Sequence, residues 1–149
     1  MSVPQFGVPE AGRDYPDRPA AFVILEHEGR IALVQVAFAR GGTRTDLPGG
    51  GLDPGETEQD AAIRECGEEA GLRVGSLEPL VRADHYFVNE KGQSHNTRGV
   101  FFAARLLGAD PALKIEDDHT LVWVEPVEAL RRLDRDSHAW AMAAWLRRR

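Results

Sequence analysis

Three glutamates lie close together in one short segment of this sequence, at Glu65, Glu68 and Glu69. On a helix that advances about 100° per residue they share one face roughly 100° wide. Like charges at this spacing destabilise a helix, and a hard divalent cation with oxygen ligands, such as Mg²⁺, would offset their repulsion. A solvated acidic face is the alternative that helix composition alone leaves open. The segment is therefore a candidate metal site.

A fixed spacing surrounds these glutamates. Gly50 is followed after five residues by Glu56, after seven more by Arg64-Glu65-Cys66, and then, at intervals of one residue, by Glu68-Glu69 and Gly71-Leu72. This pattern is similar to the signature box of the Nudix (MutT/Nudix) hydrolase family, and all seven fixed positions match. Cys66 stands where a larger aliphatic residue is usual, but cysteine also packs as a small hydrophobe. A chance match in a chain of this length has a probability on the order of 10⁻⁶.

The resemblance implies a set of metal ligands. In the family, the box forms a loop–helix–loop that holds one or more Mg²⁺ or Mn²⁺ ions. Carried over to this sequence, Glu65 and Glu69 would be the main ligands, and Glu68 a further ligand or the base that activates water. Glu56 would support the site through water or a second ion, and the Gly49 carbonyl could add a backbone ligand. The expected cofactor is therefore Mg²⁺ or Mn²⁺.

The same resemblance assigns two further roles. Arg64 would belong to the catalytic group with Glu65 and Glu68, where it would orient the glutamates by ion pairing and not touch substrate. Gly50 would let the loop pass close to the metal and the substrate phosphates. The implied reaction is attack of water on one phosphorus of a diphosphate. The metal would lower the pKa of the water and neutralise phosphate charge, and one carboxylate would take the proton.

Substrate contacts outside the box are less clearly marked. Arg40 and Arg44 precede it and could bind substrate phosphates as bidentate donors, or be solvated loop arginines. Tyr86 and Phe87 could stack on a base, although aromatic residues in strands usually belong to the core. Thr45 stands where many relatives carry Trp, and no proline follows where relatives that hydrolyse ADP-ribose carry one. The resemblance therefore makes ADP-ribose less favoured and leaves the substrate open.

A second acidic segment follows later in the chain. Glu116, Asp117 and Asp118 lie where many relatives of the family supply an extra acid. One of them could act as a ligand or as the base, with the remainder forming a solvated turn. His95 and His119 are further candidate bases, although an ordinary surface histidine would look the same in the sequence.

Strands, a loop and a helix must position the box. Short apolar runs bounded by turn residues predict strands, and a capping residue before an amphipathic run predicts a helix. The first half is expected to contain strands at Ala20–Leu25 and Arg30–Phe38, a loop at Arg40–Asp53 with a short strand at Thr45–Leu47, and a helix at Thr57–Ala70. In that helix Thr57 and Asp60 should form a capping box, and Gly71 should end it. Its core-facing arc is expected to hold Ala62, Ile63, Cys66 and Ala70.

The second half of the sequence predicts a hairpin, a further strand and two helices. The same signals place strands at Leu77–Val88 and Thr97–Leu107 around a turn at Asn89–Gln93, a strand at Leu121–Val124, and helices at Pro126–Leu133 and Ser137–Arg149. Ser137 is the expected N-cap of the last helix. This order predicts an α/β fold with helices on the faces of a mixed sheet. The resemblance implies a Nudix-type α/β/α sandwich.

Composition and charge limit the partners and the cellular location that we expect for this protein. The chain has 149 residues and a net charge of −6, which disfavours a nucleic-acid partner. No apolar run approaches the ~18 residues that span a bilayer, and the start lacks the features of a secretory signal. The lone Cys66 fits a reducing cytoplasm. We therefore expect a cytoplasmic protein with a small nucleotide-type substrate and no membrane partner.

The domain organisation is expected to be simple. The proline-rich residues 1–19 predict an irregular arm, and residues 20–149 the Nudix hydrolase domain. The arm could reach a neighbouring subunit, so a monomer and a homodimer both stay open. The expected function is hydrolysis of a diphosphate linkage in a nucleoside diphosphate linked to another moiety. The alternatives are a non-catalytic Nudix-fold nucleotide-binding or regulatory module and an RNA 5′ pyrophosphohydrolase.

Overall fold

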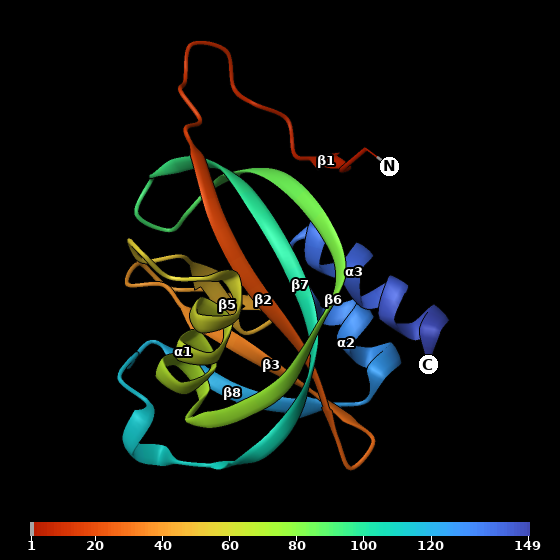
Figure 1. Ribbon diagram of the computed structural model, residues 1–149. Coiled ribbons are helices and arrows are strands. Elements are labelled where there is room, and N and C mark those ends of the chain that lie inside the picture. Colours follow the sequence, from red (N-terminus) through yellow and green to blue (C-terminus); the bar gives the residue numbers. More distant parts are fainter. Residues whose placement is uncertain (1) are drawn as a thin grey trace.

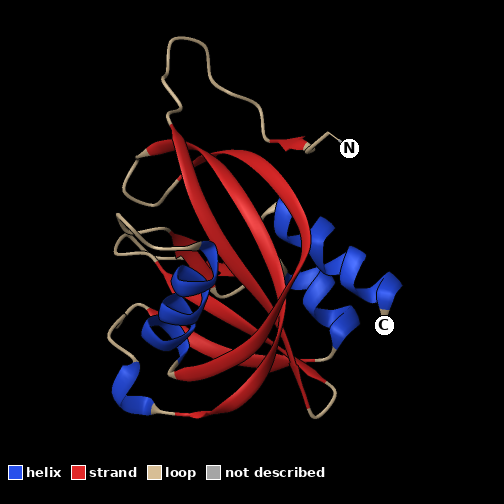
Figure 2. Ribbon diagram, viewed as in Figure 1, coloured by secondary structure: helices blue, strands red, loops and turns tan. Residues whose placement is uncertain are grey.

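A curled mixed β-sheet organises the chain in a computed structural model that describes residues 2–149 (Figures 1 and 2). The strands pair in the order β1-β6-β7-β2-β3-β4, with β5 on β2 and β8 on β3. Their bounds are β1 (Gln5–Phe6), β2 (Asp17–His27), β3 (Arg30–Ala37), β4 (Thr43–Asp46), β5 (Gly49–Gly51), β6 (Leu72–Val88), β7 (Ser94–Ala109) and β8 (His119–Val124). The helices are α1 (Glu58–Ala70), α2 (Pro126–Arg132), α3 (Asp136–Arg148) and the 3₁₀ helix η1 (Pro111–Leu113).

The helices cover both faces of the sheet, so the predicted α/β/α sandwich is confirmed (Figure 1). Successive side chains of a strand point to opposite faces. In β2, Ala21, Val23 and Leu25 belong to the core beneath α1, whereas Phe22 and Ile24 belong to the core beneath α2 and α3. A strand that is apolar on both faces is typical of the middle of a sandwich.

The middle strand β2 brings the glycine loop into the sheet. It pairs in parallel with β7 and antiparallel with β5, where Gly49 lies opposite Phe22 and Gly51 opposite Ala20. The sequence predicted a loop at this position, and the structure shows a short strand. Strand propensity reflects side-chain packing, and three glycines offer none, so only the pairing with β2 reveals this strand.

The helix that carries the box begins and ends as its sequence predicts. The Thr57 hydroxyl accepts from the Asp60 amide, and the Asp60 carboxylate accepts from the Thr57 amide, which completes the capping box. Gly71 ends the helix in a left-handed conformation with φ of 66°. Both signals act within a few residues, so tertiary contacts do not override them.

The last helix begins differently from the prediction. Arg135 is its N-cap and makes no side-chain capping hydrogen bond. Ser137 lies inside the first turn and is buried, with its hydroxyl 2.8 Å from Nδ1 of His85. The predicted cap at Ser137 is therefore wrong, because a partner on β6 takes the hydroxyl that would have capped the helix. Within residues 2–149, no helix is long and apolar enough to cross a membrane.

The segment before and within α3 fixes the loop that leads to β5. The Leu47 amide donates to Nδ1 of the buried His138 at 3.1 Å. The Thr45 amide donates to the Asp134 carboxylate at 2.7 Å. Burial lowers the pKa of His138 well below its usual value, so the ring is neutral and can accept at Nδ1. The residues before and within α3 thus anchor the loop that leads to the glycines of β5.

The short strand β1 lies along the edge of the sheet, and the chain between β1 and β2 loops away from it (Figure 1). Gln5 and Phe6 pair in parallel with Asp84 and His85 of β6, and the Phe6 ring lies 5.8 Å from that of Trp140. The strand predicted from Ala20 starts earlier, because β2 already pairs with β7 at residue 17. The division of the chain at residues 19 and 20 stays a prediction.

Candidate functional site

The carboxylate ridge of α1, formed by Glu65, Glu68 and Glu69, lies beside β5. Ala62, Cys66 and Ala70 on the neighbouring arc are buried against the sheet, as predicted. Glu69 is also buried, with 7% of its surface exposed. Ile63 was expected in the core but is 42% exposed, so that prediction is wrong. The small side chains at positions 61, 62 and 66 bring α1 onto the sheet along a narrower stripe that leaves Ile63 outside.

Arg64 joins the acids of the box. Its Nε and Nη2 donate to the two carboxylate oxygens of Glu56, at 2.8 and 2.9 Å. Its Nη1 donates to Glu65 at 2.9 Å and to Glu68 at 3.0 Å, and Nη2 also donates to the Gly51 carbonyl at 3.1 Å. The hydrogen bond from Arg64 lowers the pKa of Glu56 to about 2. One guanidinium is thus shared by several carboxylates, which leaves the group with excess negative charge.

The glycines let the ridge approach the backbone of β5. A side chain on Gly50 would place its Cβ 2.9 Å from the carboxyl carbon of Glu65. Gly49 has a φ of 147°, and a Cβ there would lie 2.2 Å from the Ala21 carbonyl oxygen. The Gly49 amide donates to Glu69 at 2.9 Å. Only residues without a side chain fit between β2 and these carboxylates.

The electrostatics of the ridge favour a bound cation. Burial and the charge of Glu69 raise the pKa of Glu65 to about 7, although Arg64 opposes the shift. Half-buried carboxylates whose charges are not compensated are suitable ligands for a hard divalent ion. The donor chemistry of this group therefore fits the magnesium or manganese ion expected from the sequence.

A second group of side chains meets the ridge at Glu69. The His119 ring lies between two acids, with Nε2 at 3.2 Å from Glu69 and Nδ1 at 2.8 Å from Asp118. Burial alone would lower the pKa of His119, but the hydrogen bonds and charges of Glu69 and Asp118 raise it to about 9. Ligand atoms of Glu116, Asp118 and His119 all lie within 4.8 Å of one another. Asp117 is exposed and lies outside this group.

A cavity of about 420 Å³ opens beside the ridge. Glu65 and Glu69 contribute to its lining, together with residues of β2, β4, β5, β7 and the β6–β7 turn. Of the two arginines that the sequence proposed for substrate, Arg44 lines this cavity. Arg40 is exposed and lines a shallower groove next to it.

The floor of the cavity contains a buried ion cluster, defined as Arg44, Asp46, Glu90 and Arg135. Arg44 lies 2.9 Å from both Asp46 and Glu90, and Arg135 lies 3.2 Å from Asp46. The Arg135 guanidinium also lies over the Phe87 ring, 3.9 Å from its centroid. The donors of Arg44 are therefore shared with acids of the protein. Arg135 was missed in the sequence because it is 89 residues from Asp46 and belongs to no motif.

Not all of the remaining candidates reach the cavity. Phe87 and His95 line the cavity. Tyr86 points elsewhere and packs edge-on against Tyr15, with ring centroids 5.4 Å apart. The cavity also has Arg18 in its wall, which the sequence did not single out. The order Asp17-Arg18-Pro19 before the strand predicted at Ala20 was the available signal, and it is too common to be informative.

The chain is similar in sequence to curated proteins whose names describe different reactions. RNA pyrophosphohydrolase of Sphingopyxis alaskensis is 30% identical over 114 residues, which cover 70% of this chain and 72% of that protein. Isopentenyl-diphosphate Delta-isomerase of Escherichia coli is 31% identical over 129 residues, which cover 83% of this chain and 68% of that protein. The sequence relationship therefore extends well beyond the box.

Solved structures give the same fold. A NUDIX hydrolase from Nitrosomonas europaea superposes with a TM-score of 0.69 over 89% of each chain, at 18% sequence identity. The family model of the NUDIX domain matches residues 16–147, which include both the carboxylate ridge and the cavity. The chain therefore belongs to the Nudix hydrolase family, and it is a metal-dependent hydrolase that cleaves diphosphate linkages.

Proposed function

We propose that this protein hydrolyses a diphosphate linkage in a nucleoside diphosphate linked to another moiety, with Mg²⁺ or Mn²⁺ as the metal ion. The observation that carries this proposal is the excess of negative charge on the carboxylate ridge at one end of the cavity. A metal ion there would face the space that the substrate enters.

Glu65 and Glu69 are the proposed main ligands, with Glu68 as a further ligand. Glu56 would act through water or a second ion, and the Gly49 carbonyl would complete the set. A divalent ion bound here supplies Lewis acidity, neutralises phosphate charge and activates water. Arg64 holds Glu56, Glu65 and Glu68 in place by the hydrogen bonds described above and does not contact substrate.

The proposed base is Glu68 or Glu116. Glu68 has 28% of its side chain exposed and is held by Arg64 alone, so a carboxylate oxygen is free to accept a proton from water. Asp118 is hydrogen-bonded to His119, and Asp117 is exposed and lies outside the group of side chains that meets the ridge. Glu116 lines the cavity next to the ridge, where its amide donates to the Glu68 carbonyl at 3.1 Å. Comparing Glu68→Gln with Glu116→Gln separates them, because loss of the base should lower kcat much more than it raises KM.

RNA is the second candidate substrate. Several relatives are named RNA pyrophosphohydrolase, which supports a 5′-phosphorylated RNA end as substrate. The net charge of −6 disfavours an extended RNA-binding surface, but it is compatible with recognition of the RNA 5′ end alone. A non-catalytic binding module is the weaker alternative, because the box keeps all its glutamates. A cytoplasmic location and the choice between monomer and homodimer also stay proposals.

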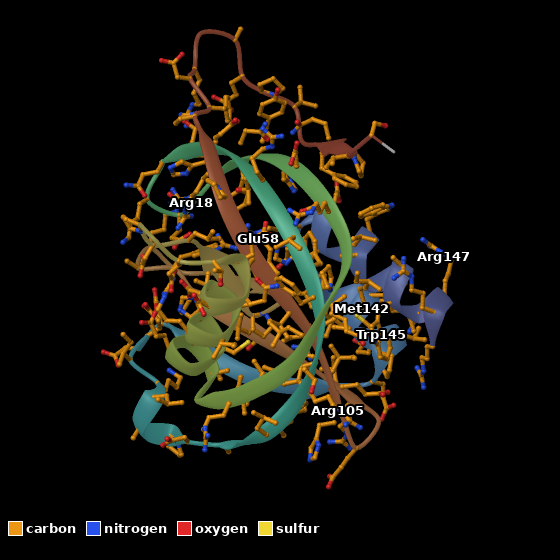
Figure 3. The ribbon with its side chains drawn as sticks, viewed as in Figure 1. Arg18, Glu58, Arg105, Met142, Trp145 and Arg147 are labelled. Atoms are coloured by element: carbon orange, nitrogen blue, oxygen red, sulfur yellow. The ribbon has the colours of Figure 1, made fainter. Side chains whose placement is uncertain are left out.

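The test is hydrolysis of defined substrates by the purified protein with Mg²⁺, Mn²⁺ or EDTA. The panel should contain nucleoside triphosphates, nucleotide sugars, dinucleoside polyphosphates and a 5′-triphosphorylated RNA, with products separated by mass. We expect metal-dependent release of a nucleoside monophosphate or of pyrophosphate. Glu58→Gln is a matched control, because Glu58 starts the same helix (Figure 3) but pairs with Arg82, and neither residue lines the cavity. Hydrolysis that persists in Glu69→Gln or in EDTA would contradict the proposal.

A further inference from the structure

Arg18 lies in the wall of the cavity against the bare backbone of β5. A Cβ built on Gly51 would be 2.6 Å from Nε of Arg18 and 2.9 Å from its Cζ, so the absence of a side chain at Gly51 makes room for the guanidinium. Figure 3 shows Arg18 at the start of β2, near the turn of the β6–β7 hairpin. The charge of Arg18 is thus held in the wall of the same space that Glu65 lines.

Arg18 differs from its neighbouring arginines in having no acidic partner. Arg44 and Arg135 are neutralised within the ion cluster. Arg98 lies on the neighbouring strand β7 at the same end of the sheet. It pairs with Asp17 at 3.0 Å and with Asp84 at 2.8 Å. Among residues 2–149, no carboxylate forms an ion pair with Arg18. Its guanidinium donors are therefore free for a ligand.

The residues around Arg18 offer further donors, and Glu90 of the β6–β7 turn is already paired within the ion cluster. His95 and Thr97 on β7 line the same wall, and Thr97 is directly opposite Arg18 in the strand register. Burial, and then the charge of Arg18, lower the pKa of His95, so this ring is neutral and can donate a hydrogen bond from one nitrogen. Lys91 in the β6–β7 turn adds a second cation to the lining. This wall is suited to an anion.

We propose that Arg18 binds a phosphate group that lies beyond the diphosphate held at the carboxylate ridge. The substrate class is then a nucleoside with a 5′ chain of three or more phosphates, and not a nucleoside diphosphate sugar. A guanidinium matches the geometry of a phosphate and binds it with charge-assisted hydrogen bonds, whereas an uncharged sugar would leave the charge unused. This inference rests on the proposed function, because it assumes that the ridge and its ion hold the cleaved linkage.

The test compares two substrates with the same base, a nucleoside triphosphate and a nucleoside diphosphate sugar. In Arg18→Gln we expect KM for the triphosphate to rise about tenfold or more, with little change in kcat, because one charged hydrogen-bonding group is lost. KM for the sugar derivative should not change. Arg18→Lys should recover part of the loss, and Arg98→Gln is the matched control that should behave as wild type. A 5′-triphosphorylated RNA as a third substrate distinguishes free nucleotides from RNA ends.

A binding measurement separates this inference from the proposed function. Calorimetric titration of a non-hydrolysable imido analogue of the triphosphate, with Mg²⁺, should show affinity about tenfold weaker in Arg18→Gln than in wild type or Arg98→Gln. Equal affinity in all three proteins would overturn the role of Arg18. If wild type and Arg18→Gln cleave the triphosphate with the same KM, the proposed function holds and this inference fails. If it binds the analogue through Arg18 but cleaves nothing, the proposed hydrolysis fails and the phosphate site remains.

Discussion

The carboxylate ridge and the buried ion cluster are both built from arginine and acidic residues, but the ridge is negatively charged and the cluster is balanced. In the ridge region one arginine, Arg64, serves several glutamates. In the ion cluster two arginines pair with two acids. A buried cluster whose charges compensate one another forms a rigid floor for the cavity. Carboxylates whose charges are not compensated need a bound cation instead. Charge balance, more than the number of charged residues, therefore separates the metal site from its support.

The largest expected effect is on the ridge. Glu69→Gln removes a proposed metal ligand and keeps the size of the side chain, so kcat should fall on the order of a thousandfold, equivalent to about 4 kcal/mol of transition-state stabilisation. The free energy of unfolding should change much less. Steady-state kinetics beside urea denaturation measures both. Near-normal turnover in this variant would remove Glu69 from the metal site.

The converse change is Asp46→Asn in the ion cluster. It leaves the buried Arg135 without its carboxylate, so the free energy of unfolding should fall by about 3 kcal/mol. Urea denaturation monitored by tryptophan fluorescence checks this. Glu90→Gln is the control, because Glu90 is the more exposed acid of the cluster and its loss should cost under about 1 kcal/mol. Equal losses in the two variants would mean that burial does not distinguish the pairs.

The pH dependence of stability should distinguish the two regions without a mutation. In the metal-free protein the pKa of Glu65 is raised from 4.5 to about 7, so the folded state holds a proton that the unfolded state releases. Stability from this group is present below about pH 4.5 and is lost as pH rises to about 7, by on the order of 2 kcal/mol. His119, with its pKa raised to about 9, acts in the same direction at higher pH.

Urea denaturation in EDTA at about pH 5 and pH 7.5 measures this loss. Saturating Mg²⁺ should reduce it, because the ion favours the carboxylate form. Glu65→Gln should flatten the metal-free dependence over the same interval. A wild-type protein whose stability does not change with pH in EDTA would be inconsistent with a repelled carboxylate at Glu65.

The smallest effect is expected from Arg64→Gln, which removes a group that positions the ligands and is not itself a ligand. We expect kcat/KM to fall about tenfold and Mg²⁺ affinity to weaken by a similar factor. The free energy of unfolding should fall less than in Asp46→Asn, because the freed carboxylates can be solvated. A stability loss as large as that of Asp46→Asn would show that Arg64 supports the fold more than the site.

The sequence by itself determined the parts of this protein that depend on neighbours along the chain. The capping box of Thr57 and Asp60 and the stop at Gly71 fix α1, and helical periodicity then places Glu65, Glu68 and Glu69 on one ridge. The spacing of the box also identified the family, which the match over residues 16–147 confirms. These features involve few residues and short distances, so composition and spacing are sufficient to read them.

The tertiary structure decided which distant residues meet the ridge. The glycines of β5 form a strand only because β2 pairs with them, and Ser137 lies inside its helix because His85 takes its hydroxyl. Arg135 and Arg18 join the cavity from opposite ends of the chain. No local pattern encodes such contacts, because they depend on how strands and helices pack once the core has formed. Charge balance, which separates the metal site from its floor, is therefore visible only in the folded protein.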